Sequence, residues 1–488
     1  SYKPMSVVIA IDAGTTGVRS RAVFADGSDS ISSYREFTQY FPQPGWVEHD
    51  AEEIWQAVLA TLQEVINQLN EPVAAIGITN QRETVVAWSR KTGKPYGSAI
   101  VWQDRRTADR CAQLAEHLPT VRQQTGLVLD PYFSGTKFEW LIKNREIKVD
   151  QDLCLGTIDS WLIFKLTGQK DFVTDVTNAS RTMLFDIKKM CWSEELCGLL
   201  DVPIKNLPTV LPSSGRFGIT TEHGALRAGI AISGVAGDQQ AALFGQACFN
   251  TGATKNTYGT GSFVLMNVGE QCPEPQTGIL TTVAWQLEKQ KPVYALEGAI
   301  FVTGAAIQWL RDGLNIIDHA SEIGPLAQSV EDSGGVVLVP AFAGLGSPWW
   351  DPYARGSIFG ITRGTTRAHI ARATIESIVF QTRDVVESMS AASGVKVKDL
   401  RVDGGAAVID FMLQLQADHL GVDVLRPKQL ETTAMGAGFL AGLGEKVWSS
   451  TSEISQAWQL DQKFEPKSVA VGYDAWKNAV NRSMNWIS

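Results

Sequence analysis

Two short turns rich in glycine and threonine, one in each half of the chain, constrain the fold more than any other feature. The first turn, at residues 13–17, reads Ala-Gly-Thr-Thr-Gly and lies between apolar runs at 7–12 and 18–25. The second turn, at residues 256–262, reads Asn-Thr-Tyr-Gly-Thr-Gly-Ser and precedes the apolar run 263–266. Short apolar runs bounded by turn residues are typical of buried strands. The repetition therefore predicts a duplicated strand–turn–strand unit.

Strand patterns alternate with helical patterns along the rest of the N-terminal half. A helix is predicted after Asp50, a suitable N-cap with Glu53 three residues later, and its apolar positions continue at helical spacing to Leu69. Residues 74–78 and 99–102 have the short apolar pattern of strands, and each run ends in polar residues. This alternation predicts an α/β fold.

The C-terminal half repeats the alternation. A long helical pattern covers residues 370–389, and the strand pattern 400–403 leads through a glycine pair at 404–405 into another helix. Because 488 residues exceed what one hydrophobic core usually organises, we expect two domains. No linker rich in proline or serine separates the halves, so the domains are expected to be tightly joined. We place them at residues 1–247 and 248–488.

Glycines also recur near the C-terminal end, at positions 436, 438 and 442. Their spacing lacks the sequence context of a dinucleotide-binding motif or of a membrane helix pair. We interpret them as a site of close helix packing.

The composition excludes several classes of protein. A formal net charge of −9 argues against a nucleic-acid partner, which requires a basic face. The apolar run at residues 7–11 is too short for a membrane span or for the core of a signal peptide. The six cysteines lie far apart without disulfide or metal-binding spacing, which is typical of a reducing compartment. We therefore expect a cytoplasmic protein with no membrane span.

The first turn has the residues that phosphate binding requires. Its glycines let the backbone approach a phosphate, the hydroxyls of Thr15 and Thr16 can donate hydrogen bonds, and Arg19 adds positive charge. Asp12, at the end of the preceding strand, can hold Mg²⁺ directly or through water. A plain polar hairpin turn explains this segment equally well on its own. Together with the second turn and the glycine pair at 404–405, it favours a polyphosphate gripped between two domains.

Other polar residues leave two interpretations open. Asp238 could accept the proton of a substrate hydroxyl, or it could cap the helix that is predicted to follow it. Arg82 and Glu83 could form a surface ion pair, or a fork that grips hydroxyl groups. Trp102 and Phe263 could belong to the core, or they could be platforms for a ligand. The residue types alone do not decide between these alternatives.

Six ordered motifs resemble those of the FGGY carbohydrate kinases, and within that family those of the members that phosphorylate glycerol. The motifs lie at residues 44–50, 77–84, 130–137, 237–240, 256–261 and 349–356. The similarity runs in order, without large gaps, from about residue 7 to about residue 445. The resemblance implies two α/β domains of the actin/hexokinase (ribonuclease H-like) type with the active site in the cleft between them.

The resemblance also implies the reaction and its residues. The γ-phosphoryl group of ATP, bound with Mg²⁺, would pass to a terminal hydroxyl of glycerol, giving sn-glycerol 3-phosphate. Asp238 would be the general base, and Asp12 would assist Mg²⁺. The residues expected to bind glycerol are Arg82, Glu83, Trp102, Tyr132, Asp238, Gln239 and Phe263, with Trp102 and Phe263 as apolar walls. Those expected to contact the nucleotide are Thr15, Thr16, Gly17, Arg19, Thr260, Gly304, Gln308 and Gly405.

The chain departs from the family pattern in the phosphate turn, where Ala13 replaces glutamine and Gly17-Val18 replaces a serine pair. It departs again at Ile409, where an asparagine usually meets the adenine base. A kinase of the same family acting on a longer polyol or a ketose is the closest alternative. A non-catalytic actin-like nucleotide switch is the alternative from another class, and Asp238 and the Arg82-Glu83 pair argue against it. We also expect a homo-oligomer, either a dimer or a tetramer.

Overall fold

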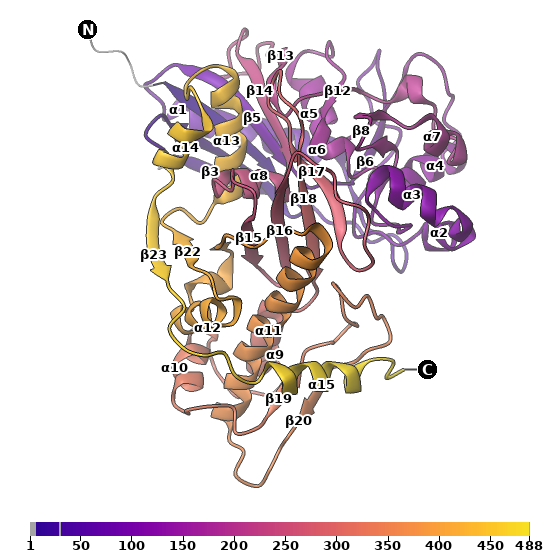
Figure 1. Cartoon of the computed structure of the whole chain (residues 1–488). Coiled ribbons are helices and arrows are strands. Elements are labelled where there is room, and N and C mark those ends of the chain that lie inside the picture. The colour runs from indigo at the N-terminus through magenta and orange to yellow at the C-terminus, as the bar shows by residue number, and fades with distance from the viewer. Residues whose placement is uncertain (1–5, 29–30, 488) are drawn as a thin grey trace.

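Two mixed β-sheets, one in each half of the chain, organise the computed structural model, which describes residues 6–28 and 31–487 (Figure 1). The N-terminal sheet has the order β13-β14-β5-β1-β2-β3. Its strands are β1 (Val7–Ala13), β2 (Gly17–Phe24), β3 (Ser32–Glu36), β5 (Val73–Asn80), β13 (Ser214–Ile219) and β14 (Ala231–Gly237). The C-terminal sheet has the order β17-β18-β16-β15-β21-β22-β23. Its strands are β15 (Ala253–Tyr258), β16 (Ser262–Gly269), β17 (Leu280–Trp285), β18 (Val293–Ile300), β21 (Asp399–Asp403), β22 (Val424–Pro427) and β23 (Leu460–Phe464).

The two sheets share one local arrangement. In the N-terminal sheet, β1 runs antiparallel to β2 and parallel to β5. In the C-terminal sheet, β15 runs antiparallel to β16 and parallel to β21. The glycine and threonine turns connect the antiparallel pair in each case. The predicted duplication of a strand–turn–strand unit is therefore confirmed.

Helices cover the sheets through their apolar faces. Helix α1 (Ala51–Asn67) packs on the N-terminal sheet, and its N-cap Asp50 accepts a hydrogen bond from the Glu52 N–H at 2.9 Å. Glu53 does not complete a capping box, because its carboxylate accepts hydrogen bonds from Tyr40 and from the Thr38 N–H instead. Further helices are α5 (Ile158–Leu166) on the N-terminal sheet and α9 (Gly304–Asp312), α10 (Ile323–Gln328), α11 (Arg367–Ser393), α12 (Asp410–Leu420) and α15 (Tyr473–Ser483) in the C-terminal half.

A smaller layer is attached to the N-terminal sheet. It contains the four-stranded sheet β4-β7-β6-β8, formed by β4 (Glu48–His49), β7 (Ala99–Ile100), β6 (Val85–Ser89) and β8 (Leu153–Thr157), with α4 (Ser134–Asn144) beside it. The strand predicted at 99–102 ends at Ile100, so Trp102 stands in the loop that follows. Short elements complete this half: α2 (Ala108–Gln113), α3 (Leu118–Thr125), α6 (Val176–Ala179), α7 (Glu194–Leu199), and the strand pairs β9 (Val173–Asp175) with β12 (Thr209–Leu211) and β10 (Phe185–Asp186) with β11 (Cys191–Trp192).

Two helices join the halves by backbone contact. Helix α8 (Asp238–Gly245) follows the last strand of the N-terminal sheet, and α13 (Thr432–Gly444) returns from the C-terminal half to lie against β5 and β14 (Figure 1). A Cβ atom at Gly436 would stand 1.7 Å from the Ala241 carbonyl oxygen, and one at Gly245 would stand 1.9 Å from the Thr432 carbonyl oxygen. The interpretation of the C-terminal glycines as a site of close helix packing is confirmed for Gly436, whereas a Cβ at Gly438 would meet the Val23 side chain of β2 and one at Gly442 the Trp448 ring. The division between residues 247 and 248 stays a prediction.

Within residues 6–28 and 31–487, no helix is long and apolar enough to cross a bilayer.

The α8–α13 contact predicts an unusual response to alanine. Gly436→Ala would force the two helices apart, and overpacking of this kind costs about 1–3 kcal/mol despite the better helix propensity of alanine. The midpoint of thermal unfolding should therefore fall. The matched control is Gly198→Ala in α7, where a Cβ would meet nothing within 4 Å. There alanine should be neutral or stabilise by up to about 1 kcal/mol. Equal midpoints for the two variants would contradict the tight crossing.

Candidate active site

Arg82 and Glu83 lie just after β5. Their side chains are 2% and 1% exposed, so the alternative of a surface ion pair is wrong. Glu83 has a φ of 65°, in the left-handed region that residues with a Cβ rarely adopt. Such backbone strain persists only where the surrounding structure fixes it, and it is found mostly at functional sites.

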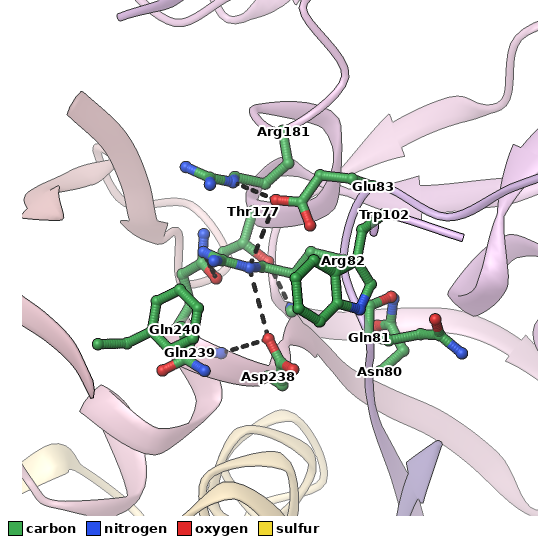
Figure 2. A network of polar contacts seen from close by, with 12 residues as sticks. Asn80, Gln81, Arg82, Glu83, Trp102, Thr177, Arg181, Asp238, Gln239 and Gln240 are labelled. Carbon is green, nitrogen blue, oxygen red and sulfur yellow. Dashed lines mark hydrogen bonds and ion pairs between the residues drawn. The ribbon is translucent and has the colours of Figure 1, made fainter. Parts of the chain in front are cut away.

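Arg82 and Glu83 belong to a network of four buried charges with Arg181 and Glu297, of which Figure 2 shows Arg82, Glu83 and Arg181. The Arg82 Nη1 donates to Glu297 Oε1 at 2.5 Å. Arg181 donates from Nε to Glu83 Oε2 at 2.7 Å and from Nη2 to Glu297 Oε2 at 2.8 Å. Burial opposes ionisation of Glu297, but the guanidinium groups of Arg181 and Arg82 outweigh it and lower the Glu297 pKa to about 2. Because Glu297 lies on β18, the network ties the C-terminal half to the N-terminal one.

Tyr132 is placed by a buried lysine. The Arg82 Nη2 donates to the Tyr132 hydroxyl at 3.0 Å. The Lys137 ammonium donates to the carbonyl oxygens of Pro131, Tyr132 and Phe133 at 2.9, 2.7 and 2.8 Å. Burial lowers the Lys137 pKa to about 7, and these three acceptors satisfy all its donors. The loop that carries Tyr132 is thereby fixed beside Arg82.

Asp238 is the first residue of α8, and its carboxylate faces Arg82 (Figure 2). Its Oδ1 lies 3.4 Å from the Arg82 Nε and accepts a hydrogen bond from the Gln239 N–H at 2.8 Å. Burial raises the pKa of the Asp238 carboxyl, and Arg82 limits that rise. The N-cap position of α8 is Gly237, but the Asp238 carboxylate still accepts a hydrogen bond from the N–H of Gln239 in the first turn of the helix, so the two interpretations of Asp238 are compatible. Its side chain remains 30% exposed.

A second buried lysine, Lys255, contacts both Gln239 and Phe263. The Lys255 ammonium donates to Gln239 Oε1 at 2.5 Å, to Thr257 Oγ1 at 3.0 Å and to the Phe263 carbonyl oxygen at 3.2 Å. Burial lowers the Lys255 pKa to about 8. The lysine therefore orients Gln239 from the C-terminal side of the cleft.

A cavity of about 720 Å³ opens beside these polar groups. Trp102 and Tyr132 form part of its wall on the N-terminal side, and their rings meet edge to face with centroids 5.7 Å apart. Phe263 and Phe301 line the side contributed by the C-terminal half. Of the predicted polyol residues, Trp102, Tyr132 and Phe263 line this aromatic-walled space, and Arg82 is joined to its wall through the Tyr132 hydroxyl.

Asp12 is a partly buried carboxylate near two other carboxylates, those of Asp238 and Glu431. Burial raises its pKa to about 7, Asp238 and Glu431 add to the rise, and Arg19 opposes it. Among the residues that the structure describes, no group of three or more metal-ligating side chains is present. Mg²⁺ needs no such group, since it is held by one or two carboxylates together with substrate phosphates and water. The three carboxylates around Asp12, opposed only in part by Arg19 and Arg21, therefore fit a divalent cation that arrives with a nucleotide.

The predicted nucleotide residues lie on the two glycine and threonine turns, at the start of β2, on α9 and at the turn after β21. Thr260 and Gly304 are neighbours, because the Gly304 N–H donates to the Gly259 carbonyl oxygen at 2.9 Å and the Ala305 N–H donates to that of Thr260 at 3.1 Å. Gly405 and Gln308 are exposed, the first at the turn after β21 and the second on α9.

The first turn contributes the remaining predicted nucleotide residues. Thr16 is exposed, and its hydroxyl lies 3.2 Å from the Tyr34 hydroxyl. The Arg19 guanidinium lies over the Tyr34 ring, 4.9 Å from its centroid. Gly17 has a packing role, since a Cβ there would stand 2.6 Å from the Tyr34 hydroxyl oxygen.

The sequence reasoning missed Arg181, Glu297 and both buried lysines. Glu297 and Lys255 interrupt the otherwise apolar or neutral strands β18 and β15. A charge within such a strand is a signal of a buried ion pair, since burying an unpaired charge is costly. Lys137 ends the motif at 130–137 that was singled out without a role for it.

The fold and the site together define an α/β protein of the actin-like class. Residues 7–245 match the N-terminal domain of the FGGY family of carbohydrate kinases, and residues 254–444 match the C-terminal domain of that family. The chain belongs to the FGGY family of carbohydrate kinases. The resemblance noted from the motifs is confirmed.

Individual relatives agree with this assignment. The chain is 52% identical over 497 residues to Glycerol kinase 2 of Thermotoga maritima, covering 99% of both chains. It is 51% identical over 491 residues to the glycerol kinase of Deinococcus radiodurans, covering 98% of both. The crystal structure of Plasmodium falciparum glycerol kinase with ADP has a TM-score of 0.93 at 35% identity, covering 99% of both chains. A xylulose kinase from Rhodospirillum rubrum, at 21% identity and a TM-score of 0.87, shares the fold and covers 98% of both chains. The expected fold class is confirmed.

The buried network predicts a pH-dependent effect of Glu297→Gln. Removing one member of a buried ion pair costs about 3–5 kcal/mol, so the variant should be destabilised at pH 7. Because folding lowers the Glu297 pKa from its ordinary 4.5 to about 2, its charge stabilises the fold above pH 4.5, and that contribution is lost as the pH falls towards 2. Denaturant unfolding should therefore show a stability gap that narrows from pH 5 to pH 3.

The control for that experiment is Glu116→Gln, whose native side chain is 81% exposed. This variant should match the unsubstituted protein at every pH. Glu297→Gln and the unsubstituted protein should differ less in free energy of unfolding at pH 3 than at pH 5. A difference that stays constant over this range would contradict the ionised state of Glu297.

Proposed function

We propose that the protein is an ATP-dependent kinase that phosphorylates glycerol to sn-glycerol 3-phosphate. The observation that supports this most strongly is the buried Arg82-Glu83 pair, which lies with Tyr132 and Asp238 beside the aromatic-walled cavity. A small polyol offers little apolar area, so its recognition depends on paired hydrogen bonds to such groups. Full-length relatives that are 51% and 52% identical are named glycerol kinases, which supports the same substrate here.

Polyol recognition is assigned to groups that the network holds in place. Arg82 donates to substrate hydroxyls, and Glu83 accepts from them, while Tyr132 and Gln239 provide further partners. Arg181 restricts Glu83, and Lys255 restricts Gln239, so neither acceptor needs to reorganise on binding. Trp102 and Phe263 cover the carbon chain and exclude water.

Asp238 is assigned as the general base. Phosphoryl transfer depends mainly on positioning and charge stabilisation, with one residue accepting the proton of the attacking hydroxyl. Burial raises the pKa of the Asp238 carboxyl, which makes it a better proton acceptor. Arg82, 3.4 Å away, keeps the carboxylate oriented towards the cleft and available as the anion.

Nucleotide binding is assigned to residues of the two glycine and threonine turns, of β2, of α9 and of the turn after β21. Thr15, Thr16 and Arg19 would meet the terminal phosphates, Gly17 would keep the first turn in place, and the residues that would contact the rest of ATP are Thr260, Gly304, Gln308 and Gly405. Asp12 would hold Mg²⁺, which when bound neutralises charge on the phosphate oxygens.

Three further features are part of the proposal and rest on the sequence. They are the division into domains at 1–247 and 248–488, a cytoplasmic location, and assembly as a homodimer or homotetramer. A second substrate class, a longer polyol or ketose, is favoured by one observation, since the cavity of about 720 Å³ exceeds the size of glycerol.

Loss of the base predicts a specific kinetic change. Asp238→Asn should lower kcat by about 10² to 10⁴ without lowering the midpoint of thermal unfolding, because the amide keeps the shape but cannot accept the proton. The control is Asp474→Asn, whose native carboxylate is 99% exposed, and it should keep full activity. A coupled assay of ADP release measures both. Retention of more than a tenth of the native kcat in well-folded Asp238→Asn would contradict the assignment.

Substrate hydroxyls should control turnover. Glycerol should exceed 1,2-propanediol in kcat/KM by up to about 10⁴-fold, because the missing hydroxyl leaves buried protein groups unpaired. The same assay across erythritol, xylulose and gluconate compares the second substrate class. Comparable turnover of 1,2-propanediol, or a preference for a five-carbon ketose, would contradict glycerol as the substrate.

A further inference from the structure

One side-chain hydrogen bond connects the polyol cavity to the phosphate turn. The Trp102 Nε1–H donates to Thr15 Oγ1 at 3.0 Å. An indole N–H is only a donor, so the threonine oxygen must be the acceptor in this bond. The hydroxyl hydrogen of Thr15 is then left to be donated elsewhere, and the Thr15 side chain is only partly buried. The bond thus orients a hydroxyl that can donate to a phosphate oxygen.

Trp102 is held at its backbone by a chain of hydrogen bonds that also ends at the phosphate turn. The Trp102 N–H donates to Thr84 Oγ1 at 3.2 Å, and that hydroxyl donates to Gln81 Oε1 at 2.7 Å. The Gln81 side chain donates from Nε2 to the Gly14 carbonyl oxygen at 3.2 Å. Together with the bond between Trp102 and Thr15, these contacts close a ring between the cavity wall and the turn.

A buried histidine adds a second path to the same turn. The His49 Nε2 lies 2.7 Å from Gln39 Oε1, which can only accept, so this nitrogen carries the hydrogen. The His49 Nδ1 then accepts from Gln81 Nε2 at 3.2 Å, and Gln39 Nε2 donates to the Thr15 carbonyl oxygen at 2.9 Å. Both the side chain and the backbone of Thr15 are therefore fixed by the network that holds Trp102.

We propose that Trp102 is a positioning residue for the nucleotide as well as a wall of the polyol cavity, and that its bond to Thr15 couples the binding of the two ligands. This inference rests on the proposed function. A polyol packed against the indole restricts the ring and, through it, the Thr15 hydroxyl. The second ligand then meets a turn that is already ordered, so each ligand tightens the binding of the other. Linkage requires the two effects to be equal.

Calorimetric titration of the non-hydrolysable ATP analogue AMP-PNP with Mg²⁺, with and without saturating glycerol, tests the coupling. In the unsubstituted protein, glycerol should lower the Kd of AMP-PNP by about 5-fold or more. Trp102→Phe keeps an aromatic wall but removes the N–H, so glycerol should still bind while this factor falls towards one. The factor by which glycerol lowers the Kd of AMP-PNP should fall towards one in Thr15→Val as well. The double variant Trp102→Phe/Thr15→Val should show no further fall.

Thr15→Ser is the matched control, because it keeps the hydroxyl and should keep the coupling factor. Thr15→Val alters the opposite end of the bond, so it tests the coupling even if Trp102→Phe folds poorly. A factor that persists in both single variants, or separate losses that add in the double variant, would overturn the coupling alone. If glycerol produces no binding heat and leaves the AMP-PNP titration unchanged in the unsubstituted protein, the proposed function and the coupling are both overturned.

Discussion

The charge on Glu297 makes the rest of the polyol pocket possible. Two guanidinium groups and the Glu83 carboxylate lie in a region closed to water, and isolated charges cannot be buried there without a large desolvation cost. Glu297 compensates Arg82 and Arg181 at once through its two oxygens. Since it belongs to the C-terminal sheet, the pocket exists only when the two halves of the protein are docked. The ion pairs that stabilise the interface between the halves therefore also hold the polyol pocket in place for its substrate.

The two buried lysines are also compensated by partners, but without carboxylates. Lys137 and Lys255 are matched mainly by carbonyl, hydroxyl and amide oxygens rather than by carboxylates, so their charge is spread over several dipoles. Each fixes one element of the site: Lys137 fixes the loop of Tyr132, which lines the cavity, and Lys255 fixes the Gln239 side chain. These elements are thus held by buried amino groups that lie behind them.

Local pattern predicted the elements of this protein well, and long-range pairing limited the prediction of the site. The strands beside the two turns were evident because a short apolar run and a glycine turn are properties of neighbouring residues. Arg82, Asp238 and Tyr132 were identified through motifs. Glu297 lies 215 residues from Arg82 and 116 from Arg181, and no local sequence pattern predicts an ion pair between residues so far apart in the chain. The strand expected at 99–102 was too long, because Trp102 leaves the sheet to reach Thr15.

The backbone contact between α8 and α13 lies within one helical turn of Asp238. Asp238 begins α8, and the helix meets α13 at two points, Ala241 against Gly436 and Gly245 against Thr432. At a rise of about 1.5 Å per residue, Asp238 lies about 4.5 Å along the axis from Ala241, and a tilt of about 13° about that point carries it through about 1 Å. A displacement of about 1 Å at a reacting group can change a rate about 10²-fold. Rocking of one half on the other by about that angle is then sufficient to engage or withdraw this carboxylate.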